Sequence, residues 1–383
     1  MTPVLITGAG AVSCLGVGVP AMWKALCAAP EIRPRPAADP GARMRLPLIH
    51  PAPAEPGTDG RATRLALTAA REAIVDAGLT SSECARAPVV LGTGGGNADH
   101  WERPLAAARP APPGFTVAAA LATAIGSGAG ATCVSNACAA GGFALAIAAD
   151  LIRTGEAEVV VAGGAEAYSR VALACFNRMG AVDARACRPF HRDRAGTVFG
   201  EGAAVFVLET ADHARRRGVR HAYARLAGSG WSCDAHHLTA PEPAGSQIRR
   251  AMTDALDEAG ATTGTVGCVV PHGTGTRLND VVESQALGAV FGDHAAHLPV
   301  YSLKALIGHT AGAAGALGAL AAALMLDHGT VPPNAPLGPE QDPHCPVNLP
   351  QGPSQPLTGR HILVNAFAFG GNNVSLVLEG SAA

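Results

Sequence analysis

One cysteine stands where an apolar segment gives way to a run of small residues. Cys138 follows Ser135-Asn136 and precedes Ala139-Ala140-Gly141-Gly142, after which apolar residues recur at helical spacing as far as Gly155. This pattern predicts a strand that ends before Cys138 and a helix that begins at it. A helix N-terminus favours the thiolate, which is the form of cysteine that attacks an acyl carbon. Cys138 is therefore a candidate nucleophile, and a buried structural cysteine is the alternative.

Three further glycine-rich turns carry polar side chains after apolar segments. The first, residues 271–280, holds His272, and the second, residues 302–310, holds Lys304 and His309. The third, residues 365–373, offers backbone N–H groups that can face a developing oxyanion. A lone histidine near a turn is more often a structural hydrogen-bond partner than a catalyst, so each turn alone is a weak signal. Together they favour acyl-transfer chemistry on a thiol.

These turns must be positioned by a large, compact scaffold. The 383 residues exceed the usual size of a single core, so two domains or two fused halves are expected. Hydrophobic residues make up 48% and charged residues 15%, which is typical of an enzyme with much internal surface. The net charge of −2 gives no electrostatic footprint for nucleic acid, so we expect no nucleic-acid partner.

Cysteine spacing and hydropathy indicate the compartment. The ten cysteines form no Cys-x-x-Cys pair and no cluster with histidine at zinc spacing, which predicts reduced thiols in a cytoplasmic protein and no metal site. The chain opens on an apolar strand at 3–8 and leaves no room for a signal peptide. The longest apolar run, 311–326, is rich in Ala and Gly, and it predicts a buried helix rather than a membrane span.

Two parts of the chain look like versions of one another. Cys138-Ala-Ala-Gly-Gly and His309-Thr-Ala-Gly-Ala-Ala-Gly each lead into an Ala-rich helix, and each half has a short apolar strand that ends in glycines, at 89–94 and 269–275. An internal duplication explains this pattern. The strands are apolar on both faces and alternate with helices, so we expect an α/β fold with mixed sheets covered by helices, with halves at residues 1–210 and 211–383.

The ordered motifs resemble those of the β-ketoacyl-acyl carrier protein synthases, in the Cys-His-His branch of the thiolase superfamily. The resemblance runs nearly end to end, and it includes the opening at 5–10, the segments 161–166 and 187–190, Gly200-Glu201-Gly202-Ala203, and the three glycine-rich turns. It implies a five-layered αβαβα thiolase fold built from two similar halves, and a dimer.

The resemblance also implies a role for each matched residue. Cys138 would carry the acyl chain as a thioester, and His272 and His309 would promote decarboxylation of a malonyl group and stabilise the enolate. Lys304 counts among the catalytic residues, with Glu283 and Asp280 as supporting charges, although a plain buried ion pair between Lys304 and Glu283 is an open alternative. The remaining matches are the oxyanion N–H groups of Cys138 and Phe369, and the substrate or pantetheine contacts Thr274, Thr276, Phe369, Ala368 and Thr197.

Departures from the family pattern concern the substrate. Ala368 stands where most relatives have glycine, and because Ala disfavours positive φ, it is expected to stiffen the turn beside the gating residue Phe369. Thr197 stands where many relatives carry phenylalanine near the malonyl site. These departures favour a specialised polyketide or polyene synthase over a housekeeping fatty-acid enzyme.

Four other functions fit the sequence less well. A Rossmann dehydrogenase fails because Ser13 replaces the third glycine after Gly8-Ala9-Gly10. A thiolase-type acyltransferase would need a second catalytic cysteine, and Cys345 lies in a Pro-rich loop. A starter enzyme with a Cys-His-Asn triad would have asparagine in place of His309. A non-catalytic chain-length subunit would have lost the nucleophile.

The implied partner is an acyl carrier protein, whose phosphopantetheine arm carries the substrates, and no further cofactor is expected. We expect a homodimer in which residues 159–161 pair across a twofold axis, and the alternative is a heterodimer with a ketosynthase-like subunit.

Overall fold

The strands of the protein join into one long path across the molecule. The computed structural model describes residues 2–102, 114–336, 338 and 340–380. The path runs β11 (Val266–Val270), β14 (His361–Phe367), β15 (Asn372–Glu379), β10 (Ala224–Cys233), β1 (Val4–Ser13), β9 (Gly202–Thr210), β7 (Val159–Glu166), β5 (Val89–Gly92) and β6 (Ala131–Val134), with β2 (Gly16–Val17) paired to β1. Short strands lie outside it: β3 (Arg35–Pro36), β4 (Leu48–His50) and β8 (Phe199–Gly200) form one sheet, and β12 (Thr330–Val331) and β13 (Gln355–Pro356) form another.

This path is two sheets joined at a narrow seam. Strands β1 and β10 pair only at Leu5 with Arg225 and at Ile6 with Ala224. On one side, β5 pairs parallel with β6 and β7, and β7 and β1 pair antiparallel with β9. On the other side, β11 pairs parallel with β14, and β15 pairs antiparallel with both β14 and β10. Both sheets are therefore mixed, and the two halves repeat one arrangement.

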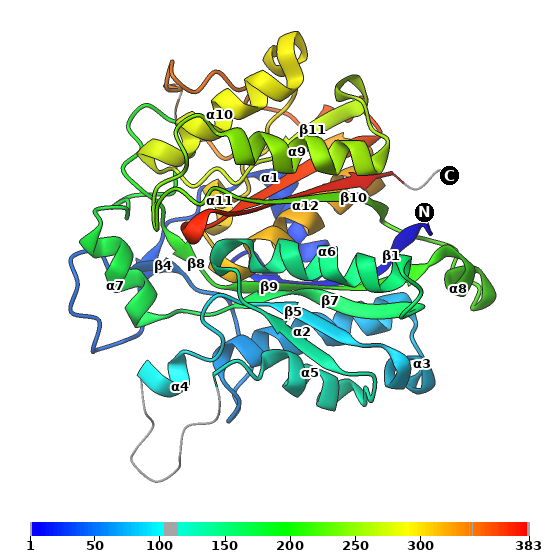
Figure 1. The fold of residues 1–383 in the computed structure, drawn as a ribbon. Coiled ribbons are helices and arrows are strands. Elements are labelled where there is room, and N and C mark those ends of the chain that lie inside the picture. The colour runs from blue at the N-terminus through cyan, green and yellow to red at the C-terminus, as the bar shows by residue number, and fades with distance from the viewer. Residues whose placement is uncertain (1, 103–113, 337, 339, 381–383) are drawn as a thin grey trace.

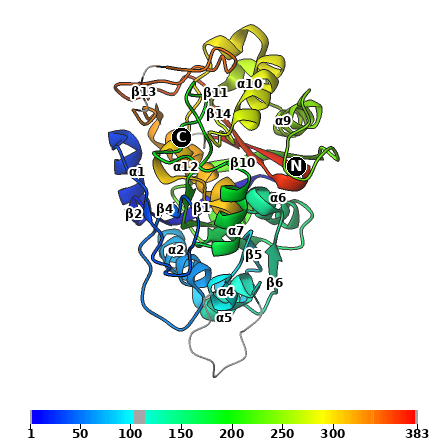
Figure 2. The same ribbon diagram turned by 90° about the vertical axis from the view of Figure 1, so that its left-hand side faces the viewer.

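Helices form the other three layers. Helices α2 (Arg61–Ala77) and α5 (Val117–Ile125) cover the outer face of the first sheet, and α9 (Ser246–Ala259) and α10 (Arg277–Phe291) lie over the second. Helices α6 (Ala140–Arg153) and α12 (Ala314–His328) lie between the two sheets. Figures 1 and 2 show this αβαβα order from two sides, which confirms the predicted fold class. The remaining helices are α1 (Val19–Ala28), α3 (Ser81–Arg86), α4 (Asp99–Glu102), α7 (Arg170–Arg178), α8 (Ala211–Arg216) and α11 (Lys304–Ile307).

The sequence of each helix fits its layer. Helix α9 buries residues at the spacing of one helical face, from Ile248 to Leu256, and leaves its other face in solvent. Helix α12 buries every residue from Ala314 to Met325, as a central helix must. The span 311–328 is long and apolar enough to cross a membrane, but 78% of it is buried inside the protein, so the predicted buried helix is confirmed.

The two central helices touch through their backbones. A Cβ added to Gly141 of α6 would lie 2.8 Å from the carbonyl oxygen of Gly312, and one added to Gly315 of α12 would lie 2.6 Å from the nitrogen of Gly142. Glycine is required here because any side chain would separate the helices. This contact holds the starts of α6 and α12 together.

The strand expected at the dimer axis is not at an edge. Strand β7, which contains residues 159–161, is paired on both sides, with β5 and β9, so it has no free hydrogen-bonding edge. Within the described chain, β6 ends the path and pairs only with β5, and Ala131 and Thr132 on it are exposed. Strand β6, which Figure 2 shows at the margin of the molecule, is therefore an edge that can pair with a second subunit.

Candidate active site

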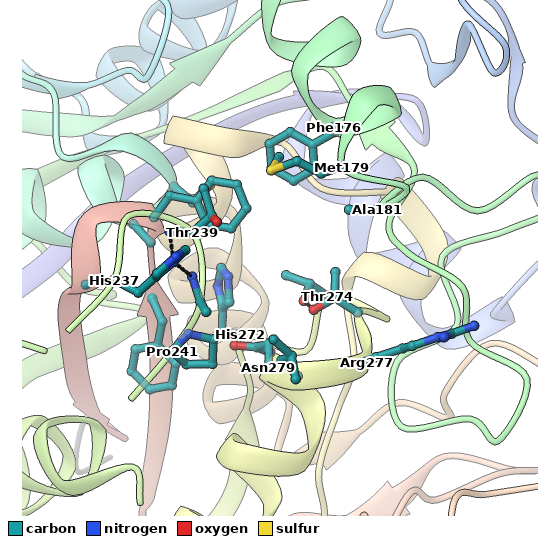
Figure 3. A pocket seen from close by; sticks show the side chains of 18 of the residues that line it. Phe176, Met179, Ala181, His237, Thr239, Pro241, His272, Thr274, Arg277 and Asn279 are labelled. Carbon is teal, nitrogen blue, oxygen red and sulfur yellow. Dashed lines mark hydrogen bonds between the residues drawn. The ribbon is translucent and has the colours of Figure 1, made fainter. Parts of the chain in front are cut away.

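Four turns, one from the first half of the chain and three from the second, meet at one cavity. The cavity has a volume of about 680 Å³, and its lining includes the predicted residues Cys138, His272, Thr274, Thr276, His309, Ala368 and Phe369. In Figure 3, His272 and Thr274 face the cavity, with Phe176 and Met179 along one side and Asn279 and Arg277 along another. The structure thus brings the thiol of the first half together with two imidazoles and two hydroxyls of the second half.

Cys138 lies at the entry to a central helix, as predicted. It is the middle residue of the 3₁₀ turn η1 (Ala137–Ala139), which connects β6 to α6. The turn begins at Ala137 with φ 48°, an uncommon value for a residue with a side chain. The backbone N–H of Cys138 donates to no other residue in the described chain, so this donor is free to face the cavity.

The electrostatic prediction for the thiol is wrong in its direction. Cys138 keeps some accessible surface on the cavity side, yet desolvation by the surrounding protein raises its pKa to about 12. The charge of Lys304 pulls this pKa down but is the smaller effect. The cost of a charge in a low-dielectric site exceeds the benefit of the helix terminus. The resting nucleophile is therefore a neutral thiol.

Two buried carboxylates of α10 shape the turn that carries His272. The oxygens of Glu283 accept the N–H groups of His272 and Gly273, each at 2.7 Å. Asp280 accepts those of Thr274 at 3.1 Å and Gly275 at 3.2 Å. Burial raises the pKa of both carboxyls, while these N–H donors oppose the rise. Glu283 and Asp280 lie behind the cavity wall and act on the backbone of the turn.

Lys304 supports the same turn and forms no ion pair with Glu283 within 4 Å. Its Nζ donates to the carbonyl oxygen of His272 at 2.5 Å. Burial lowers the pKa of Lys304, and the nearby Glu283 opposes this. The plain alternative of a Lys304–Glu283 ion pair is therefore not observed. Lys304 lies behind the reactive cavity rather than on its wall.

The two imidazoles lie close together and are uncharged at neutral pH. The ring centroids of His272 and His309 are 5.4 Å apart, with their planes at 85°. Burial, with a further contribution from Lys304, lowers the pKa of both rings well below the usual value. Within the described chain, Nδ1 of each ring is buried without a hydrogen-bond partner. Two neutral rings with spare hydrogen-bonding capacity suit the stabilisation of an anionic oxygen.

The wall beside His272 offers two hydroxyls. The Oγ1 atoms of Thr274 and Thr276 are 2.9 Å apart, and both residues line the cavity. A pair of hydroxyls at this spacing can bond an amide through both its N–H and its carbonyl oxygen. Contact of these hydroxyls with a pantetheine arm stays a prediction.

The glycine turn that follows β14 carries Phe369. Within the chain that the structure describes, the N–H of Phe369 donates no hydrogen bond, as for Cys138. The next two residues, Gly370 and Gly371, have φ of 83° and 77°, where glycine is favoured. The turn is held to a neighbouring loop because Gly370 donates to the carbonyl of Leu238 at 2.8 Å.

The reason given for a stiff gate is wrong. Ala368 lines the cavity, but its φ is −137° and its ψ is 157°, which is extended backbone that alanine adopts freely. The positive φ values fall on Gly370 and Gly371 instead. Ala368 therefore adds no strain to this conformation.

Thr197 does not line the cavity, against the prediction. Its side chain is fully buried, and its Oγ1 is 3.6 Å from the Sγ of Cys187 and 3.5 Å from the carbonyl of Val198. The cavity wall is formed by the preceding residues Ala195 and Gly196. A substrate contact at Thr197 is therefore not supported by the geometry.

Two residues of the site were missed by sequence reasoning. Glu166, at the end of β7, is buried beside the Cys138 turn and accepts the N–H groups of Gly94 at 2.6 Å and Gly312 at 2.9 Å, and burial raises its pKa to about 7. The signal that could have identified Glu166 is a charged residue at the end of a strand that is otherwise apolar. Phe176 of α7 lines the cavity, and nothing in its local sequence marks it.

The donor set gives no metal site. Among the residues that the structure describes, no group of three or more His, Cys, Asp or Glu side chains is arranged to hold a metal ion. All ten cysteines are free thiols.

Comparisons with known proteins agree with this geometry. Residues 52–214 match the beta-ketoacyl synthase N-terminal domain, and residues 223–337 match the beta-ketoacyl synthase C-terminal domain. The oxytetracycline polyketide putative beta-ketoacyl synthase 1 of Streptomyces rimosus is 35% identical, over 98% of this chain and 96% of that protein.

Solved structures share the whole fold. A chain of the ishigamide ketosynthase/chain length factor structure is similar with a TM-score of 0.90 and 34% identity, over 100% of both chains. The AntDE:AntF structure, a type II polyketide synthase acyl-carrier protein in complex with its ketosynthase, gives a TM-score of 0.87 and 26% identity, over 99% of this chain and 100% of that one. The chain therefore belongs to the β-ketoacyl synthase family of condensing acyltransferases, with the thiolase fold.

Proposed function

We propose that this enzyme elongates a polyketide-type chain by decarboxylative Claisen condensation, with the growing acyl chain on Cys138 and the malonyl unit on an acyl carrier protein. The observation that carries the proposal is the cavity that Cys138, His272 and His309 share with Phe369, where the N–H groups of Cys138 and Phe369 donate to no other residue of the described chain. Relatives named for polyketide synthesis support the substrate class.

The first half-reaction loads the acyl chain. The sulfur of Cys138 attacks the thioester carbonyl of the incoming acyl group, and the N–H groups of Cys138 and Phe369 hold the oxyanion. The bond from that carbon to the sulfur of the pantetheine arm then breaks. Because the resting thiol of Cys138 is neutral, its proton goes to the departing sulfur of the pantetheine arm. The acyl group is then bound to Cys138, and the arm is left as a free thiol.

The second half-reaction forms the carbon–carbon bond. The malonyl carboxylate leaves as carbon dioxide, and its bonding electrons become an enolate whose oxygen accepts hydrogen bonds from His272 and His309. The enolate carbon attacks the acyl carbonyl on Cys138, and collapse of the oxyanion expels the thiolate. The thiolate then takes a proton from solvent, which restores the resting enzyme.

The other matched residues position the reacting groups. Thr274 and Thr276 would hold the amides of the phosphopantetheine arm, and Glu283, Asp280 and Lys304 would fix the His272 turn. Neither half-reaction is an oxidation or a reduction. The phosphopantetheine arm of the carrier protein is therefore the one prosthetic group that the proposed reaction needs. We place the enzyme in the cytoplasm, where its free thiols would stay reduced.

The quaternary partner follows from the free edge of the first sheet. Pairing of β6 with β6 of a second copy would bury exposed backbone groups, so a homodimer is the primary proposal. The alternative is a heterodimer with a chain-length-factor-like subunit. It draws support from similarity to the ishigamide ketosynthase/chain length factor and to the complex of a ketosynthase with its chain length factor from Xenorhabdus doucetiae.

The test is to identify the acyl group on the enzyme. The protein is incubated with acyl-loaded carrier protein, and its intact mass and peptide map are recorded, with Cys138→Ala as the control. We expect one acyl adduct, located on Cys138, that is released as a longer β-ketoacyl chain when malonyl-carrier protein is added. An acyl adduct on another residue would contradict the proposal. The absence of any adduct, both for the protein alone and after a purified chain-length-factor homologue is added, would also contradict it.

A further inference from the structure

Aromatic rings form a continuous series around the reactive cavity. The ring of Phe369 is stacked on that of Phe176, with centroids 5.0 Å apart and planes at 12°. Phe176 meets Phe199 edge-on at 4.8 Å, and Phe199 lies 6.0 Å from the ring of His309. The series therefore leads from the glycine turn to a candidate catalytic imidazole.

Phe199 contacts the His309 segment through its backbone as well as its ring. Phe199 forms an isolated parallel bridge with His309, and the N–H of the following residue, Gly200, donates to the carbonyl of His309 at 3.0 Å. The backbone thus fixes Phe199 beside His309, so a displacement of the Phe199 ring would change the surroundings of the His309 ring.

Phe176 is the link between the turn and Phe199. It belongs to α7, a helix that buries only Leu173 completely and is otherwise half-buried or exposed. Helix α7 is fixed at its end by Asn177, whose side chain bonds both the N–H and the carbonyl of Leu46 at 2.9 and 3.1 Å. The helix backbone is thus held, and the Phe176 ring lies at the cavity wall, as Figure 3 shows, packed between the rings of Phe369 and Phe199.

The turn at the other end of the series is built on two glycines. Gly370 and Gly371 both have positive φ, and the turn is attached to the adjacent loop by backbone bonds, including one from the N–H of Asp234 to the carbonyl of Gly371 at 2.9 Å. An acyl group on Cys138 shares the cavity with Phe369, so its arrival can displace that ring. Packed rings move in discrete steps, so the neighbouring ring must follow or lose its contact.

We propose that Phe176 is a positioning residue that couples the conformation of the Phe369 turn to the orientation of the His309 ring. This inference rests on the proposed function, in which His309 assists decarboxylation. The coupling would bring the His309 ring into its working orientation when an acyl chain occupies the cavity. Phe176 would touch neither reacting carbon. It would act through Phe199.

The coupling can be measured without turnover. Histidine labelled with ¹³C at Cε1 gives one NMR signal for each of the 14 histidines, and the His309→Gln variant identifies that of His309. The perturbation is Phe369→Leu, chosen because the described ring contacts of His309 are with Phe199 and His272 and not with Phe369. It is introduced into the natural protein, into Phe176→Leu and into Phe176→Tyr.

We expect Phe369→Leu to shift the His309 signal in the natural protein and in Phe176→Tyr, which keeps the ring. The shift should be at least threefold smaller in Phe176→Leu. Phe199→Leu breaks the series at its next member and should have the same effect, which covers the case in which Phe176→Leu does not fold. Phe291→Leu, which removes a buried ring whose ring partner is His294, is the matched control and should leave the shift intact. Equal shifts in all backgrounds would overturn the proposal.

A kinetic readout distinguishes failure of this inference from failure of the proposed function. Phe176→Leu is expected to lower kcat for carbon dioxide release from malonyl-carrier protein about tenfold and to leave its KM within about twofold, because orientation rather than binding is lost. If the natural protein releases no carbon dioxide, the proposed function fails while the NMR comparison still decides the coupling. If it does release carbon dioxide, and Phe176→Leu has the same kcat, the coupling is contradicted.

Discussion

Cys138 and Gly312 occupy equivalent positions in the two halves of the molecule. Each is the middle residue of a 3₁₀ turn, η1 for Cys138 and η4 (Ala311–Ala313) for Gly312, and each turn leads directly into a central helix. Each also follows an alanine with positive φ, 48° at Ala137 and 39° at Ala311. The duplication thus placed a nucleophile in one half and a residue without a side chain in the other.

Replacement of Gly312 by alanine should destabilise the fold. A Cβ there would lie 2.2 Å from the nitrogen of Gly94 and 2.7 Å from Oε2 of Glu166. Overpacking of this kind costs roughly 1–3 kcal/mol or more. Urea denaturation should show this loss for Gly312→Ala, whereas Gly288→Ala, at an exposed position of α10 with nothing within 4 Å, should be neutral or stabilising. Equal midpoints for both variants would refute the close contact.

The duplication could be predicted from the sequence, but the residue-by-residue alignment of the two halves could not. The sequence comparison set Cys138 against His309, while the structure sets Cys138 against Gly312, three residues later. Repeated Ala and Gly residues allow several alignments, and the choice among them depends on the contact between α6 and α12, which lie far apart in the chain.

In the candidate site too, features set by neighbouring residues could be predicted from the sequence, and features set by packing between distant segments could not. Each turn could be predicted from the glycines and polar residues within it, so Cys138, His272 and His309 were found. Thr197 and β7 were misplaced because cavity walls and sheet edges depend on packing between distant segments. Phe176 was missed for the same reason, since its contacts are with Phe369 and Phe199.

Alkylation of Cys138 should depend steeply on pH. Because burial raises its pKa to about 12, the thiolate fraction, and with it the rate of reaction with iodoacetamide, should rise about tenfold per pH unit from pH 7 to pH 9 without a plateau. The exposed Cys175 and Cys233 should be labelled faster than Cys138 at pH 7. Peptide mapping after brief labelling measures all three, and a plateau for Cys138 below pH 8 would mean that the thiol is activated at rest.

His50 should make the protein less stable in mild acid. It is buried against the Gly308 backbone, its Nδ1 lacks a partner in the described chain, and burial lowers its pKa to about 4. The unfolded chain therefore binds a proton that the folded chain does not, so this stability is present above pH 6.5 and is lost as the pH falls toward 4.

At pH 5, the free energy of unfolding should be about 2 kcal/mol lower because of His50. His50→Gln should reduce the difference in unfolding free energy between pH 7.5 and pH 5 by about this amount, measured by urea denaturation at one protein concentration. Replacement of the exposed His344 by glutamine is the control. An unchanged pH dependence in His50→Gln would show that His50 is protonated in the folded state.

Glu283→Gln should impair decarboxylation more than acyl loading. Both carboxylate oxygens accept backbone N–H groups of the His272 turn, and an amide would turn its NH₂ group toward one of these donors. The resulting displacement of His272 should lower carbon dioxide release about 10- to 100-fold. The exposed Gln285→Ala on the same helix should match the natural enzyme. Loss of acyl loading to the same extent would mean that the whole site has collapsed.

The most direct test of the central claim is to separate the two half-reactions with His309→Ala. The variant should still take an acyl group onto Cys138, because the thiol and the N–H groups of Cys138 and Phe369 remain. Its release of carbon dioxide from malonyl-carrier protein should fall about 100- to 1000-fold, as expected on loss of an oxyanion donor. Intact-mass spectrometry and carbon dioxide release, measured on the same preparation, give both values. Undiminished decarboxylation by this variant would contradict the account.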